Sequence, residues 1–182
     1  MYLGQFAFYF PKIFRFYTYH LRLLFDQYPY LRRNFNNSIF PACTFNAGPQ
    51  CATLEHTDAA NYAGSCCPIT SGGNFNHKLG RHLILFDWDV AVEFPSGSTI
   101  IIPSSSLRHG NAAIQHGKTC ISITQYCTGG LICWVQYGFR SVKSCSSQFQ
   151  ELMAAKAGVR WSRALAMFSK VDELHKDHLS IL

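Results

Sequence analysis

The sequence predicts an α+β fold, with a strand-rich middle segment between helical segments at the two ends. Apolar residues near each end recur at helical spacing, whereas short β-branched and aromatic runs punctuated by Gly, Pro, Asn and Ser fill the middle. The chain has 182 residues, 48% of them hydrophobic and 14% charged, which suits one domain with a buried core. We expect one globular domain made of a helical segment (1–37) packed on the core, a β segment (38–143) and a second helical segment (144–182).

The first expected helix runs from about Ile13 to Tyr28. Its apolar side recurs at helical spacing through Ile13, Phe16, Tyr17, His20, Leu21, Leu24 and Phe25. Pro29 should stop it. The preceding Tyr- and Phe-rich stretch lacks a basic region and a small-residue cleavage site, so no signal peptide is expected. No apolar run approaches the ~18 residues that a membrane span needs, and we therefore expect an intracellular protein.

Five strands stand out in the middle segment because each is a short apolar run bounded by turn residues. They cover His82–Phe86, Val90–Phe94, Thr99–Pro103, Thr119–Tyr126 and Leu131–Val135. The segment 95–98 (Pro-Ser-Gly-Ser) is a turn signal, since Pro presets φ and Gly tolerates positive φ. It predicts a hairpin bend over 93–98. The aromatic residues Phe86, Trp88 and Tyr126 are expected to fill the core rather than line a pocket.

Beyond Ser144 the pattern returns to helix. Eight apolar residues there are spaced as one buried stripe: Leu152, Met153, Ala157, Trp161, Leu165, Phe168, Val171 and Leu174. A break is expected near Gly158, because glycine weakens a helix interior. The sequence therefore predicts a C-terminal helical segment with one apolar face.

The charge and the cysteines of the chain point to no particular partner. A net charge of +6 permits contacts with nucleic acid phosphates, but the basic residues are spread out in a way that is more typical of solvated helix faces. The eight cysteines contain no Cys-x-x-Cys pair. Reduced thiols are therefore expected, rather than disulfides or a structural zinc site.

Three residues predict a metal site. His56 and Asp58 are two residues apart, and on a strand or at its end such residues project to the same side of the chain. His109 follows the predicted strand Thr99–Pro103 and can face the same ion from a barrel rim. Two histidines and one carboxylate form the facial triad of non-haem Fe(II) oxygenases, which leaves positions open for a cosubstrate and O2. The other six histidines lie on a helix, in a loop, at a strand start, in a turn or near the C-terminus, and these places suit the role less well.

A longer ordered set of motifs surrounds these residues. It comprises Phe40–Asn46, Gly48–Gln50, His56–Asp58 with Asn61, Gly73–Phe75, His82–Leu85, Phe94–Ser98, His109–Asn111, Thr124–Tyr126 and Gly129–Leu131. In these motifs the chain resembles the Tet-like 2-oxoglutarate/Fe(II) oxygenase domains that are abundant in fungi. The resemblance implies a double-stranded β-helix, or jelly roll, in which His56, Asp58 and His109 hold Fe(II). It also implies decarboxylation of 2-oxoglutarate to succinate with oxidation of a C–H bond.

The sequence departs from that family at the residue expected to bind the cosubstrate. In the family, an Arg near the start of the strand after the distal His pairs with the far carboxylate of 2-oxoglutarate. Here Cys120 stands in its place, while the Ser two residues on is kept as Ser122. A thiol cannot supply the charged fork that a carboxylate prefers. Lys118, which shares the strand parity of Cys120, is the expected substitute, with Arg108 and Arg81 as further candidates.

Three interpretations follow. The first is an active dioxygenase. Its substrate is a methylated base in DNA, a small molecule or a protein, and the protein is expected in the nucleus if the substrate is DNA. The second is a catalytically degenerate relative that keeps the fold and the iron site; Cys133, at the place of a second family Arg, favours it. The third, a cupin-like barrel, is disfavoured because such barrels present more His and a Glu. Asn61 either contacts the cosubstrate or, as Asn in a turn more often does, orders its own loop.

Overall fold

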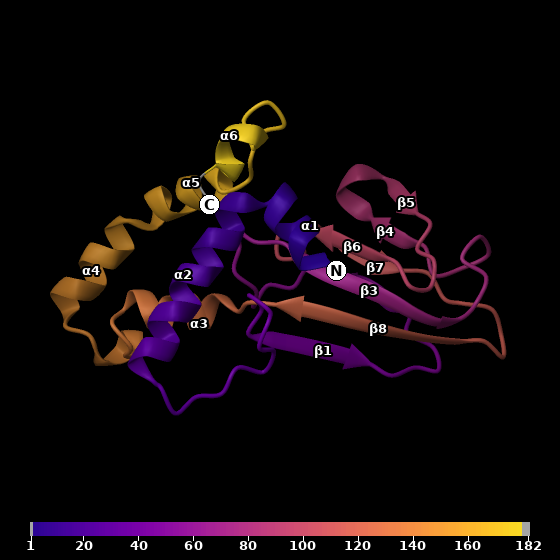
Figure 1. Cartoon of the computed structure of the whole chain (residues 1–182), viewed down its shortest axis with the longest axis horizontal. Helices are drawn as coiled ribbons and strands as arrows, with labels where there is room; N and C mark the ends of the chain where they lie inside the picture. Colours follow the sequence, from indigo (N-terminus) through magenta and orange to yellow (C-terminus); the bar gives the residue numbers. More distant parts are fainter. Residues whose placement is uncertain (1, 180–182) are drawn as a thin grey trace. The chain divides into compact units, whose positions relative to one another are not determined.

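The computed structural model describes residues 2–179, which fall into two compact units (Figure 1). The unit called here the β unit comprises residues 42–61 and 66–126. The remaining described residues make up the helical unit. All the residues predicted to bind the metal or the cosubstrate lie in the β unit, so this unit can be analysed by itself.

The β unit, all of whose residues the structure describes, contains two four-stranded antiparallel sheets. One has the order β1-β8-β3-β6, made of Ala42–Asn46, Thr119–Tyr126, Cys67–Asn74 and Thr99–Ile102. The other has the order β2-β7-β4-β5, made of Thr53–His56, His109–Asn111, Leu83–Leu85 and Val90–Val92. Except between β4 and β5, the chain changes sheet at every step. Two interleaved sheets of this kind form a jelly roll, which confirms the predicted α+β fold with a double-stranded β-helix.

A cluster of apolar side chains forms the core of the β unit. It consists of Leu83, Leu85, Phe94, Ile102 and Leu107, with Ile69, Val92 and Ile100 packed against it. Along β4, Leu83 and Leu85 are buried whereas Ile84 between them is only half-buried, because successive side chains of a strand point to opposite faces. Each fully buried side chain of this size contributes about 1.5–3 kcal/mol. The cluster therefore joins both sheets near the strands that carry the predicted ligands.

Four of the five predicted strands are confirmed, with the ends shifted by no more than two residues. The fifth prediction, Leu131–Val135, is wrong, because this segment lies in helix α3 (Gly129–Gln136). The hydroxyl of Thr128 caps this helix by accepting a hydrogen bond from the N–H of Leu131. A short apolar run does not distinguish a buried strand from a buried helix, and the capping threonine was the signal for the helix.

The predicted turn at 95–98 forms, but it does not connect a hairpin. The N–H of Ser98 donates to the carbonyl of Pro95 at 3.2 Å, and Gly97 has a φ of +85°. However, β5 before the turn pairs with β4, and β6 after it pairs with β3. The turn thus carries the chain from one sheet to the other, because turn residues determine the local backbone and not the strand partner.

The helical unit contains most of the helices. They are α1 (Tyr2–Tyr9), α2 (Pro11–Gln27), α3, the 3-10 turn η2 (Val142–Ser144), α4 (Ser147–Ala155), α5 (Ala157–Ala166) and α6 (Leu174–His178). Helix α2 confirms the predicted first helix, and Pro11 stands in its first turn, where a missing N–H costs nothing. The buried rings of Phe6 and Phe40 pack edge to face at 5.1 Å. None of the helices described in residues 2–179 has the length and apolarity that crossing a bilayer requires.

The predicted buried stripe of the C-terminal segment is wrong. Leu152, Trp161 and Leu165 are about half exposed, and Val171 is 94% exposed. The helix breaks at Lys156, between α4 and α5, and again after Ala166. Residues at helical spacing share a face only within one continuous helix, so a periodicity that crosses two breaks predicts no common face.

Candidate metal centre

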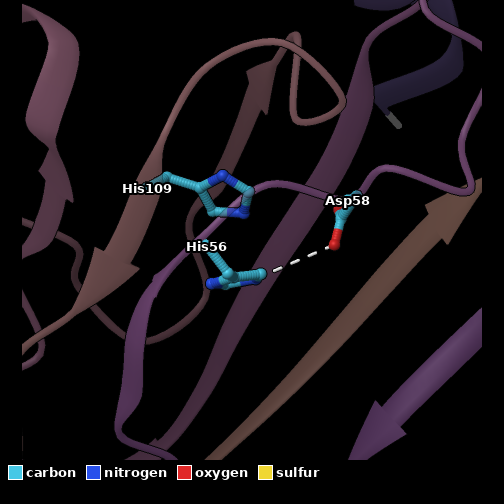
Figure 2. A group of neighbouring side chains, drawn as sticks. All are labelled: His56, Asp58 and His109. Carbon is cyan, nitrogen blue, oxygen red and sulfur yellow. Dashed lines mark ion pairs between the residues drawn. The ribbon is translucent and has the colours of Figure 1, made fainter.

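The three predicted ligands meet at one edge of the sheet β2-β7-β4-β5 (Figure 2). His56 ends β2, His109 begins β7, and the two residues are paired across the ladder with ring centroids 4.4 Å apart. Asp58 lies just beyond β2, where its N–H donates to the carbonyl of Ser104 at 2.9 Å. Nε2 of His56 lies 3.7 Å from Oδ1 of Asp58, and one donor atom from each of the three residues lies within 4.8 Å of the others.

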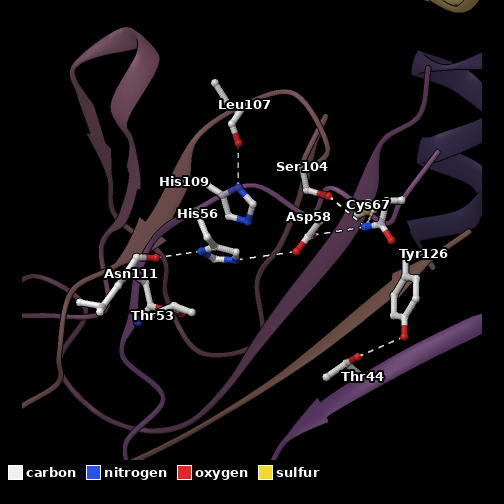
Figure 3. Close-up of polar contacts among 12 residues, drawn as sticks. Thr44, Thr53, His56, Asp58, Cys67, Ser104, Leu107, His109, Asn111 and Tyr126 are labelled. Carbon is white, nitrogen blue, oxygen red and sulfur yellow. Dashed lines mark hydrogen bonds and ion pairs between the residues drawn. The ribbon is translucent and has the colours of Figure 1, made fainter. Parts of the chain in front are cut away.

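Both histidines present Nε2 to the centre of this group. Nδ1 of His109 lies 2.9 Å from the carbonyl oxygen of Leu107 (Figure 3), and Nδ1 of His56 lies 2.8 Å from that of Leu54. A carbonyl oxygen can only accept, so each Nδ1 carries the hydrogen and each Nε2 keeps a free lone pair. A hydrogen bond on the far nitrogen is the usual way in which proteins orient a metal-binding histidine.

Burial keeps His109 in the form that binds metals. The residue is only 4% exposed, and loss of hydration lowers its pKa below the usual 6.5, although the hydrogen bond to Leu107 acts in the opposite direction. The neutral imidazole therefore predominates at neutral pH. Metal binding requires this deprotonated nitrogen, so the site does not have to release a proton from His109 first.

Asn61 orders the loop that carries Asp58. Its side-chain nitrogen lies 3.3 Å from Oδ2 of Asp58, 3.4 Å from the hydroxyl of Ser104 and 3.4 Å from the thiol of Cys67. Its backbone N–H donates to the carbonyl of Asp58 at 2.9 Å. These contacts engage Oδ2 and leave Oδ1 facing His56. Asp58, Ser104 and Cys67, the three partners of this nitrogen, are labelled in Figure 3.

The donor set fits a divalent transition metal. Bonds of about 2.0–2.2 Å hold the cis donors of a facial triad roughly 3 Å apart, so the 3.7 Å between His56 and Asp58 would shorten when an ion binds. Two imidazole nitrogens with one carboxylate oxygen are the ligands of the Fe(II) facial triad. Within residues 2–179, no second group of three His, Cys, Asp or Glu side chains brings its donor atoms together in this way.

A cavity of about 370 Å³ adjoins the three residues inside the β unit. Its volume lies in the range of small-molecule sites. Polar side chains from both sheets line it, among them Asn46, Arg81, Asn111 and Tyr126. The expectation that Tyr126 fills the core is therefore wrong, and Trp88, in the 3-10 turn η1 (Phe86–Trp88), is 60% exposed. Phe86 is half-buried.

The structure brings only part of the predicted cosubstrate set to this cavity. Ser122 and Asn61 lie in its wall, and the hydroxyl of Ser122 accepts a hydrogen bond from Asn46 at 3.0 Å. Cys120 is buried but is not among the lining residues, and its sulfur accepts the N–H of Cys51 at 3.0 Å. Lys118 is exposed and also lies outside the wall. It precedes β8 and belongs to a turn, so strand parity does not fix its direction.

The two remaining cationic candidates differ sharply. Arg108 is exposed and already engaged, with Nε 2.6 Å from Asp87 and Nη1 2.6 Å from Glu55. Hydrogen bonds from its backbone and guanidinium lower the pKa of Asp87. Arg81, in contrast, is only 2% exposed and lines the cavity. The sequence alone did not show that Arg81 lines the cavity whereas Arg108 does not.

Comparisons with known proteins match the chain only at the level of structure. No protein-family model and no curated protein matches it. NgTET1 in complex with 5mC DNA is similar with a TM-score of 0.47 at 19% identity, over 70% of this chain and 52% of that one. The viral collagen prolyl hydroxylase vCPH from Paramecium Bursaria Chlorella virus-1, in its 2OG complex, is similar with a TM-score of 0.33 at 10% identity, over 59% of this chain and 68% of that one. This chain therefore spans about half the length of NgTET1.

Proposed function

We propose that the chain is a dioxygenase that uses Fe(II), 2-oxoglutarate and O2 to oxidise a C–H bond. The observation that carries the proposal is the meeting of His56, Asp58 and His109 beside a cavity of about 370 Å³ in a jelly roll. Bound there, Fe(II) would supply the activation of O2 and of the keto acid that the protein's side chains cannot supply themselves.

The protein's own residues would bind and orient. His56 and His109 would bind the metal through Nε2, held in direction by the carbonyls of Leu54 and Leu107. Asp58 would add the third ligand and one negative charge, with Asn61 restraining its second oxygen. The cavity would place the keto acid and the substrate beside the metal and limit the access of water.

For the substrate, we propose a methylated nucleobase, as the resemblance to Tet-like domains implies. The net charge of +6 permits contact with a phosphate backbone. An enzyme that acts on a base must take that base out of the stack and into a pocket. A duplex with 5-methylcytosine, compared with the same duplex with cytosine, tests this substrate class separately from the reaction type.

Succinate production tests the reaction type. The protein with Fe(II), 2-oxoglutarate and O2 should form succinate. The variants Asp58→Ala and His109→Ala should form it at least about 100-fold more slowly, in proportion to their loss of metal binding. His116→Ala, which removes an exposed histidine outside the cavity, should keep it. Absence of succinate from protein that binds Fe(II) would refute the dioxygenase.

A metal-binding relative without catalysis is the second candidate. One observation favours it: Cys120 stands where the family has its arginine, and its buried sulfur is hydrogen-bonded to Cys51 rather than open to the cavity. This candidate predicts Fe(II) binding by the three residues, no succinate, and no binding of 2-oxoglutarate.

A further inference from the structure

Arg81 places a positive charge in the wall of the cavity that the metal ligands share. The residue precedes β4 and its N–H donates to the carbonyl of Ala113 at 3.2 Å, which continues the pairing of Leu83 with Asn111 and of Leu85 with His109. Arg81 therefore lies four residues along the ladder from Leu85, the partner of His109, or about 13 Å. Arg81 and His109 both line the cavity, so a ligand in the cavity can contact both residues.

The guanidinium of Arg81 is only partly satisfied. It donates through Nη1 to the carbonyl of Cys51, but Nε is buried and makes no hydrogen bond to any residue in 2–179. Within the same range, no carboxylate forms an ion pair with it, although the residue is only 2% exposed. A guanidinium has five N–H donors and keeps its charge in proteins, and burying an unpaired charge is costly. An anion in the cavity would offset this cost.

The backbone of Arg81 also departs from the ordinary. Its φ is +65°, in the left-handed region that non-glycine residues rarely adopt. Such a conformation persists where the surroundings hold it, and it clusters at ligand sites. The strained position therefore holds a long cationic side chain instead of the glycine that would fit it without strain.

Cys51 connects Arg81 with the position of the missing arginine. Its carbonyl accepts from Arg81, and its N–H donates to the sulfur of Cys120 at 3.0 Å. Cys51 thus bridges the cation of Arg81, which precedes β4, and the thiol of Cys120 on β8. Neither Lys118 nor Arg108 lies in the cavity wall.

We propose that Arg81 binds the far carboxylate of a dicarboxylic keto acid whose other end faces His56, Asp58 and His109. The metal end of this arrangement rests on the proposed function. The planar fork of Arg suits a carboxylate better than any other side chain. Asn46, Asn111 and Ser122, which line the same cavity, provide further polar groups near this end.

The experiment compares two keto acids that differ only at the far end. Calorimetry on the full chain loaded with Mn(II) would measure the affinity for 2-oxoglutarate and for 2-oxopentanoate, in which a methyl group replaces the far carboxylate. Arg81→Gly removes the cation and suits the positive φ, so this variant should fold. It should bind 2-oxoglutarate roughly 30- to 1000-fold more weakly and 2-oxopentanoate as before. The affinity of Arg81→Lys for 2-oxoglutarate should lie between those of the unaltered protein and of Arg81→Gly.

Three results would overturn the assignment. Arg81→Gly could weaken both keto acids equally, or neither, while it still binds Mn(II); then Arg81 does not recognise the far carboxylate. Lys118→Ala could remove the preference instead, which would give the role to Lys118. If the unaltered protein binds Mn(II) but neither keto acid, both the assignment and the dioxygenase are refuted, and this outcome is distinct from the first two.

Discussion

The candidate metal ligands are held by neighbours that act on the atoms not facing the centre. The far nitrogens of His56 and His109 contact backbone carbonyls, and the far oxygen of Asp58 contacts Asn61. Residues of this kind commonly change metal affinity by about 10- to 100-fold when they are mutated. Side chains that would not touch the metal should therefore have measurable effects on metal binding.

Asn61→Ala should weaken metal binding by about 10- to 100-fold, because Asp58 would lose the contact that directs Oδ1 toward His56. Titration with Co(II), followed by its visible absorption, measures this change. Asn37→Ala, at an exposed asparagine outside the cavity, is the matched control and should bind as the unaltered protein does. Equal affinity in both variants would show that Asp58 orients itself without Asn61.

His20 should make the stability of the protein depend on pH. Burial lowers its pKa below the usual 6.5, more than the hydrogen bond to Phe16 raises it. The unfolded chain therefore takes up this proton at a higher pH than the folded chain. Above 6.5 neither state carries the proton and nothing is lost, whereas stability falls as the pH drops from 6.5 toward the lower folded pKa.

Urea unfolding at about pH 7.5 and about pH 5.5 tests this effect in the unaltered protein and in His20→Gln. The unaltered protein should lose more unfolding free energy on acidification than the variant does. Other titrating groups contribute to both proteins, so the difference isolates His20. The same loss in both proteins would mean that the folded state accommodates the charged ring.

At the scale of elements, β7 sets the position of the two histidines. It lies between β2 and β4 and carries His109, while β2 carries His56. Gly110 allows close approach of these strands: a Cβ there would lie 2.7 Å from the carbonyl oxygen of Thr53 and 3.1 Å from that of Leu54. Both oxygens belong to the backbone of β2, which cannot give way as a flexible side chain would.

Gly110→Ala should push β2 away from β7, with a loss of about 1–3 kcal/mol in unfolding free energy and weaker metal binding through displacement of His56. Gly158→Ala, in open space on α5, should instead stabilise its helix by about 0.5–1 kcal/mol and leave metal binding unchanged. Urea unfolding and Co(II) titration measure both quantities. Unchanged metal affinity in Gly110→Ala would show that metal binding does not depend on the spacing of β2 and β7.

The elements divide clearly into those that the sequence predicts and those that it does not. Helix α2 and strand β8 follow from periodicity and from the residues that bound them. Segment 131–135 and the C-terminal stripe do not, because an apolar run has no unique period and a helix break resets the face. The partner of β5 is likewise set by the core and not by the turn at 95–98.

At the scale of the whole molecule, the topology explains why some site residues are predictable and others are not. His56 and Asp58 carry their signal within three positions of the chain, and His109 completes a recognisable ligand set. Arg81 carries no such signal, because its direction depends on how β4 pairs with β7 and on the contact with Cys51. Likewise, β1 pairs with β8 although most of the sequence of the β unit lies between them. Local patterns contain no information on partners so far apart in the sequence.

An anaerobic titration of the Fe(II)-loaded protein with 2-oxoglutarate, followed by visible absorption, tests most directly whether the keto acid binds in the cavity beside the metal. A keto acid that chelates iron produces a metal-to-ligand charge-transfer band. We expect this band in the unaltered protein, its shift to higher 2-oxoglutarate concentration in Arg81→Gly, and its loss in His109→Ala. No band in unaltered protein that holds Fe(II) would contradict the assignment of the cavity as a 2-oxoglutarate site.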